Sequence, residues 1–88
     1  MSEHLASAGN TAVPSLLALR DAGFSVTRSV ANGNDWWRAD RDDLSLVGSN
    51  TLEVLGLLKL RESRGPAWKA TDEQIDAFFS EFYPDASE

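Results

Sequence analysis

Few residues of this 88-residue chain carry groups able to take part in catalysis. The only histidine, His4, lies near the N-terminus, and the chain has no cysteine. Serine–histidine and cysteine–histidine catalysis therefore lack the partners they need within an ordered site. General acid–base chemistry would fall to carboxylates, to Lys59 or Lys69, or to the single tyrosine, Tyr83. This distribution predicts a protein with no catalytic residues and no enzymatic activity.

The acidic run Asp40, Asp42 and Asp43 is the best candidate for metal binding. Carboxylate oxygens are the ligands that Ca²⁺ and Mg²⁺ prefer. The spacing lacks the further oxygen ligands, the central glycine and the terminal glutamate of an EF-hand loop. The alternative is a polar turn in which Asp40 or Asp42 forms an ion pair with Arg38 or Arg41. We favour the ion pairs and expect neither a metal nor any other cofactor.

A cluster of basic residues runs against the acidic balance of the chain. The chain has 14 acidic and 8 basic residues, and its net charge of −6 opposes binding to nucleic acid or to anionic membranes. Basic residues beside an aromatic ring can nevertheless contact nucleic acid or an acidic protein, although cations at a helix C-terminus also complement its dipole. Weak nucleic-acid binding is therefore the alternative function. The residues of this basic strip, within 59–69, are Lys59, Arg61, Arg64, Trp68 and Lys69.

The composition also bears on the compartment. The N-terminus has no basic segment followed by an apolar run, so it does not resemble a signal peptide. The longest apolar stretch, VLGLLKL, is far shorter than a membrane span. Together with the absence of cysteine, these features predict a soluble cytoplasmic protein without membrane contact.

The elements that must position these residues begin with a β-hairpin. Residues 24–31, FSVTRSVA, alternate apolar and polar side chains, as a half-buried strand does. Asn32-Gly33 follows, which is the strongest short signal for a two-residue hairpin turn. The returning strand is then 34–40, NDWWRAD, and this turn pairs Arg28 with Trp37 and Ser29 with Trp36.

This register separates the two adjacent tryptophans. Trp37 falls on the apolar face and belongs to the core, whereas Trp36 falls among serine, threonine and arginine. Trp36 could stack on Arg38 as a cation–π pair, or a terminal segment could cover it. It could also anchor a binding partner, because tryptophan and arginine are enriched at interface hot spots. The tentative partner-binding set is Trp36, Arg38 and Thr27.

Three helices and a short strand complete the predicted fold. Pro14 at the start and Gly23 just past the end frame a helix over 14–22. Helices over 51–64 and 72–83 both begin with a capping box, and Leu44 and Leu46 suggest a short third strand. Gly56 within the second helix suggests close backbone packing. The third helix carries an apolar stripe at helical spacing, namely Ile75, Phe78, Phe79 and Phe82.

The fold class predicted is therefore α+β, with the helices packed on one face of a small antiparallel sheet. We expect flexible tails at 1–12 and 84–88 around a single domain at 13–83. The function predicted is a small non-catalytic protein-interaction module. Its partner would be an unidentified protein or a second copy pairing through the hairpin edge, and nucleic acid is the less favoured partner.

Overall fold

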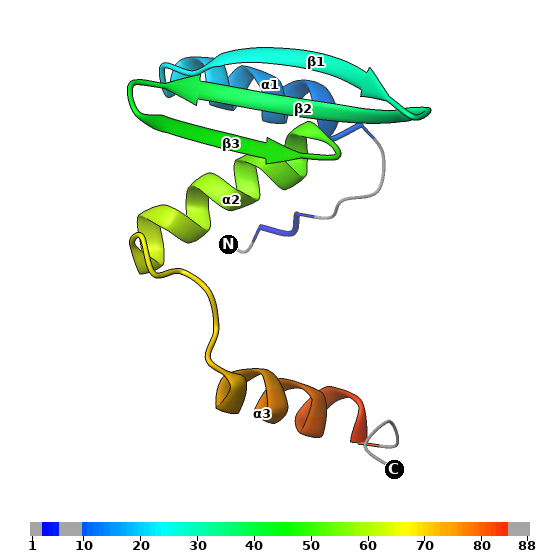
Figure 1. Ribbon diagram of the computed structural model, residues 1–88, viewed down its shortest axis with the longest axis vertical. Helices are drawn as coiled ribbons and strands as arrows, with labels where there is room; N and C mark the ends of the chain where they lie inside the picture. The colour runs from blue at the N-terminus through cyan, green and yellow to red at the C-terminus, as the bar shows by residue number, and fades with distance from the viewer. Residues whose placement is uncertain (1–2, 6–9, 85–88) are drawn as a thin grey trace.

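The computed structural model describes residues 3–5 and 10–84 (Figure 1), and the predicted tails at 1–12 and 84–88 lie in part outside these residues. It confirms the α+β class. In the part of the chain that the structure describes, the elements are, in chain order, α1 (Ala12–Asp21), β1 (Ser25–Ala31), β2 (Asn34–Arg41), β3 (Leu44–Gly48), α2 (Thr51–Arg64) and α3 (Asp72–Phe82).

The predicted hairpin is confirmed residue by residue. Asn32 and Gly33 have φ values of 55° and 79°, the left-handed conformation that a two-residue turn of this kind requires. The antiparallel register pairs Arg28 with Trp37 and Ser29 with Trp36, as expected. The short third strand is also present, and the sheet order β1-β2-β3 leaves β1 and β3 as its edges.

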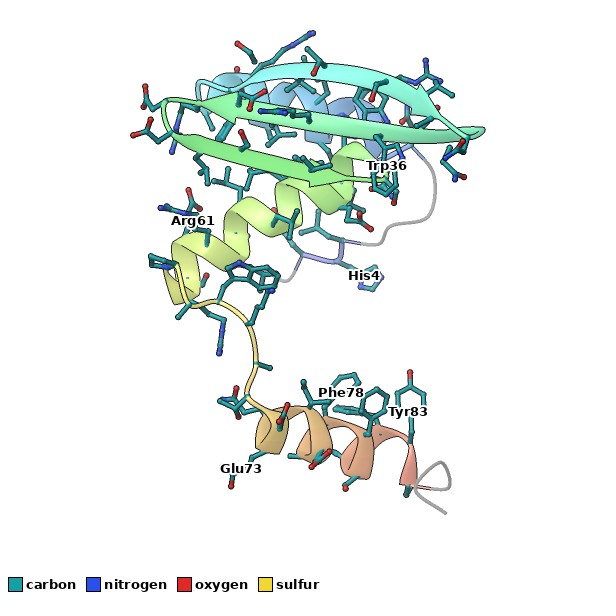
Figure 2. The ribbon with its side chains drawn as sticks, in the orientation of Figure 1. His4, Trp36, Arg61, Glu73, Phe78 and Tyr83 are labelled. Atoms are coloured by element: carbon teal, nitrogen blue, oxygen red, sulfur yellow. The ribbon has the colours of Figure 1, made fainter. Side chains whose placement is uncertain are left out.

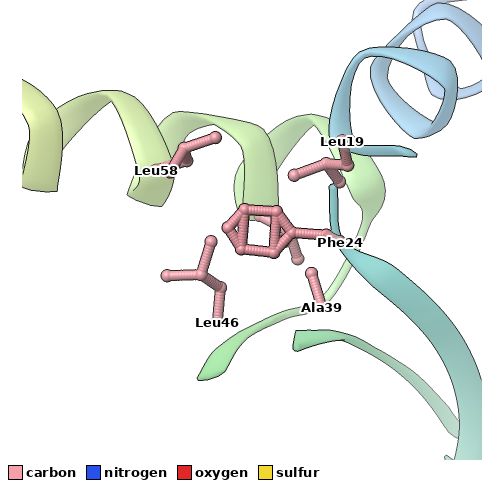
Figure 3. Close-up of a cluster of buried hydrophobic side chains, with 6 residues drawn as sticks. Leu19, Phe24, Ala39, Leu46 and Leu58 are labelled. Carbon is pink, nitrogen blue, oxygen red and sulfur yellow. The ribbon is translucent and has the colours of Figure 1, made fainter. Parts of the chain in front are cut away.

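The core lies between one face of the sheet and the helices α1 and α2. Trp37 is half-buried against it, which confirms the inward side of the hairpin. Figure 3 shows Phe24 at the centre of this cluster, where the guanidinium of Arg41 lies 4.5 Å from its ring centroid. Among residues 3–5 and 10–84, the buried hydrophobic residues are Leu19, Phe24, Ala39, Leu46, Val54 and Leu58.

Two hydrogen bonds join segments that are distant in sequence, and they tie α1 to the sheet at one end and to α2 at the other. Arg41 donates from its guanidinium to the carbonyl oxygen of Ala22 at 2.7 Å, which ties the end of α1 to β2. The hydroxyl of Thr51 donates to the carbonyl oxygen of Ala12 at 2.8 Å, which ties the start of α2 to the start of α1. Ala22 is the C-cap of α1, where carbonyl groups lack a partner within the helix.

The helix ends differ from the predictions in small ways. α1 begins at Ala12, so Pro14 lies third in the helix, where its missing N–H is still not needed. Asn50 caps α2, but the Glu53 carboxylate accepts from the backbone N–H of Ser49 and not from that of Asn50. Apart from the adjacent residues and the nearby backbone of α2 itself, no atom lies within 4 Å of a Cβ built on Gly56, so the expected close packing at this glycine is absent.

The third helix has the predicted capping box, but it does not join the core. Thr71 and Gln74 exchange both capping hydrogen bonds, so the helix start is as expected. α3 nevertheless has no buried residue and no extended contact with the sheet, α1 or α2. Figure 1 shows it standing apart at the end of the 65–71 linker. The helices that cover the sheet are therefore α1 and α2.

The dimensions of the chain reflect this arrangement. Its radius of gyration is 16.0 Å. A compact domain of this length would have a radius of gyration of about 12 Å. No helix among the described residues combines the length and the apolar character that crossing a membrane requires.

Candidate interaction surfaces

The outer face of the sheet, opposite the helices, carries the predicted partner-binding residues. Trp36 is 43% exposed there, and Thr27 and Arg38 are exposed on the same face. Figure 2 shows Trp36 near the hairpin end of the sheet. The guanidinium of Arg38 donates hydrogen bonds to Asp40 and Ser45. The ring of Trp36 is thus available on this face, and its role as an anchor stays a prediction.

A polar network occupies the centre of the outer face. The Arg38 Nε donates to both carboxylate oxygens of Asp40 at 2.9 and 3.0 Å, and the Ser45 hydroxyl donates to the same carboxylate. The Asp40–Arg38 ion pair favoured from the sequence is therefore present. The hydrogen bond from Ser45 and those from Arg38 lower the pKa of Asp40 below its ordinary value. Within 3–5 and 10–84, no three His, Cys, Asp or Glu residues gather as metal ligands would.

This network predicts acid-dependent stability. Because the pKa of Asp40 is lower in the folded chain than in the unfolded chain, its stabilising effect is present above the unfolded pKa of about 4. The effect is lost as pH falls through the folded pKa. In urea unfolding from pH 6 down to about pH 2, the unfolding free energy of Asp40→Asn should fall less than that of wild type. Ser45→Ala should lie between them, and equal slopes for all three would contradict this account.

A groove lies between β3 and the C-terminal half of α2. Its volume is about 270 Å³. Arg61 and Ser45 are its polar lining residues, and the 65–71 linker contributes two more residues to the lining. β3 is an edge strand, so this β3–α2 groove lies along an unpaired edge of the sheet. Its apolar lining consists of Leu44, Leu46, Val47, Leu57, Pro66 and Trp68.

The structure divides the basic strip between this groove and the solvent. Arg61 and Trp68 both line the groove. Arg64 donates from its Nε to the carbonyl oxygen of Trp68 at 2.8 Å, and the Lys69 ammonium lies 5.9 Å from the Trp68 ring centroid. Lys59 is exposed on α2. Trp68 is half-buried beside β3 and α2, so only part of its ring is open to a ligand.

The third surface is the apolar side of α3, which the sequence pattern suggested would be core. Its aromatic rings pack on one another, with centroids 5.4 Å apart for Phe78 and Phe79 and 5.2 Å apart for Phe78 and Phe82. Figure 2 shows Phe78 and Tyr83 on one side of α3 and Glu73 on the other. This α3 aromatic face consists of Ile75, Phe78, Phe79, Phe82 and Tyr83, which are 42%, 49%, 49%, 61% and 53% exposed.

Comparisons with protein-family models, with curated proteins and with solved structures found no match to this chain. Its function must therefore be inferred from its own surfaces. Sequence reasoning found the outer-face residues and the basic strip. It missed the β3–α2 groove, because the lining residues come from three separate segments, and it assigned the α3 aromatic face to the core.

Proposed function

We propose that this chain is a non-catalytic protein-interaction module of the cytoplasm, which binds a protein partner through the α3 aromatic face. The supporting observation is that five large apolar side chains on one side of α3 are each about half exposed. Taking about 100 Å² of exposed area for each, the face offers about 500 Å². Contiguous apolar patches of this size on soluble proteins commonly mark protein–protein interaction sites.

The length of α3 supports the same function. The helix has 11 residues and no buried side chain to hold it. Isolated helices of this length are marginally stable in water, and most helical stability in proteins comes from packing an apolar face. The capping box contributes only about 1 kcal/mol. A partner that covers the aromatic face would supply the packing that the rest of the chain does not.

A protein partner fits the surfaces better than nucleic acid does. Stacking of bases needs a free aromatic ring beside unpaired cations. In the basic strip, Trp68 is half-buried and Arg64 is held by the Trp68 carbonyl. Weak nucleic-acid binding stays a prediction, and it requires affinity for mixed oligonucleotides that falls steeply with salt.

Affinity capture from native lysate tests the proposed function. The baits are wild type, Phe79→Asp, Ser80→Asp and Trp36→Ala, each checked for folding by far-UV circular dichroism. Ser80→Asp adds the same charge to the polar side of α3 and is the matched control. We expect a protein that wild type and Ser80→Asp retain and Phe79→Asp loses, because a buried charge at an aromatic anchor costs at least about 2 kcal/mol.

The Trp36→Ala bait separates the two apolar surfaces. Retention equal to wild type assigns binding to α3 alone, and loss assigns a share of it to the outer face of the sheet. Identical retention by wild type and Phe79→Asp would contradict the α3 aromatic face as the binding surface.

A further inference from the structure

We propose that the partner of the α3 aromatic face is a second copy of this chain, which receives α3 in its β3–α2 groove and places its own α3 in the groove of the first. This inference rests on the proposed function and names the occupant of the same surface. Such reciprocal exchange of one element is a common route to symmetric dimers.

The groove has the chemistry that the α3 aromatic face requires. Its lining is mainly leucine, valine, proline and tryptophan, and its volume is about 270 Å³. Because an apolar cavity of about 150 Å³ holds benzene, this volume has room for one or two phenylalanine rings. The most exposed ring, that of Phe82, and the central ring, that of Phe78, lie 5.2 Å apart and suit a site of this size.

The charges of the two surfaces are complementary. α3 has no basic residue and carries four carboxylates, namely Asp72, Glu73, Asp76 and Glu81. The segment 59–69 beside the groove carries four cations and one carboxylate. Docking therefore brings an acidic helix to a basic segment, in which Arg61 lines the groove itself. Pairing of α3 with another α3 would instead bring two acidic helices together, with no basic residue on either.

The short linker favours exchange over folding back. Trp68 lines the groove, and only Lys69 and Ala70 separate it from the N-cap residue Thr71. For α3 to enter its own groove, the chain would have to reverse direction within these residues. Instead, α3 stands apart from the groove at the end of the linker (Figure 1), with no extended contact with β3 or α2. Short hinges of this kind favour exchange of the following element between copies.

The area is sufficient for a stable dimer. If two rings enter each groove and the other side chains of the α3 aromatic face pack on the surface around it, each contact buries about 500 Å² on either side, and two reciprocal contacts bury about 2,000 Å² in total, the upper end of the standard range for specific interfaces. A single contact would bury about 1,000 Å², near the lower limit for a biological interface. Reciprocity therefore makes a dimer stable where one docked helix would bind weakly.

Light scattering on purified full-length chains tests the inference, over protein concentrations from about 1 µM to about 1 mM. The face variant is Phe78→Asp with Phe82→Asp, and the groove variant is Val47→Asp with Arg61→Glu. All four residues are exposed, so both variants should fold. We expect wild type to dimerise and each variant to dimerise at least about 30-fold more weakly.

Mixing the two variants is the decisive arm. The groove variant keeps an intact α3 and the face variant keeps an intact groove, so the mixture should form a heterodimer at least about 10-fold tighter than either variant alone. A groove variant that dimerises like wild type would overturn the inference in favour of α3–α3 pairing. A mixture that stays monomeric at the highest concentration would overturn it as well.

The inference and the proposed function can fail separately. Wild type that stays monomeric throughout the concentration series overturns the second copy as partner. The capture experiment with Phe79→Asp still decides whether the α3 aromatic face binds another protein. If wild type is monomeric and Phe79→Asp loses a protein that wild type captures, the proposed function holds and the face binds a different partner.

Discussion

Phe24→Ala is expected to lower the free energy of unfolding by about 3–5 kcal/mol. Phe24 is 4% exposed and lies at the centre of the core, with Leu19 and Leu46 in the same cluster. The substitution removes a ring from between the sheet and the two helices and leaves a cavity that these elements cannot fill. It also removes the surface on which the Arg41 guanidinium rests. Urea unfolding followed by far-UV circular dichroism measures the loss.

The matched control is Phe79→Ala on α3. Phe79 is the same residue type, but it is 49% exposed and lies outside the core. At a concentration where the chain is monomeric, its unfolding free energy should stay within about 0.5 kcal/mol of wild type. Equal losses for the two variants would contradict the separation of α3 from the core. A small domain has about 5–15 kcal/mol of stability in total, so Phe24→Ala should be largely unfolded in mild denaturant.

Ala77→Pro is expected to abolish partner binding and leave the remainder of the chain folded. Ala77 lies in the middle of α3, where proline removes a helical hydrogen bond and clashes with the preceding turn at a cost of about 3 kcal/mol. Because a helix of this length is marginal, that cost prevents its formation. The aromatic side chains would then no longer form one face. Affinity capture and light scattering measure the loss of binding, and urea unfolding measures the core.

Asp72→Pro is the matched control for this prediction. Asp72 is the first residue of α3, where proline is favoured, and Thr71 before it already has the extended conformation that a following proline requires. This variant should keep its binding. Binding that survives Ala77→Pro would contradict recognition of α3 as a helix, and a core destabilised by Ala77→Pro would contradict its independence from α3.

The local structure of this chain could be predicted because short segments determine it. Asn32-Gly33 tolerates the positive φ values of a two-residue turn, and this turn alone fixes the register of seven residue pairs. That register places Trp37 inward and Trp36 outward, as found. Thr71 and Gln74 likewise form their capping box from neighbouring residues.

The position of α3 could not be predicted in the same way. The spacing of Ile75, Phe78 and Phe79 shows that one side of the helix is apolar, but it does not show which surface covers that side. An apolar stripe has the same pattern whether it packs inside one chain or against a partner. The prediction that all the helices cover the sheet therefore extended a local pattern to a contact between distant segments.

The candidate sites show the same limit. Asp40 and Arg38 are near neighbours on one strand, so their ion pair could be predicted. The β3–α2 groove combines Leu46, Leu57 and Trp68 from three segments, and no local pattern brings these together. Gly56 was assigned to close packing from its residue type alone, whereas space around it is open.

Amide hydrogen exchange in α3, measured on purified wild type at several concentrations, tests the central claim most directly. At about 1 µM, the amides of α3 should exchange nearly as fast as those of an unfolded peptide, while those of β2 stay protected. At about 1 mM, α3 should become at least about 30-fold slower as its aromatic face is covered. Protection of α3 equal to that of β2 at every concentration would contradict the account, because α3 would then be packed within its own chain.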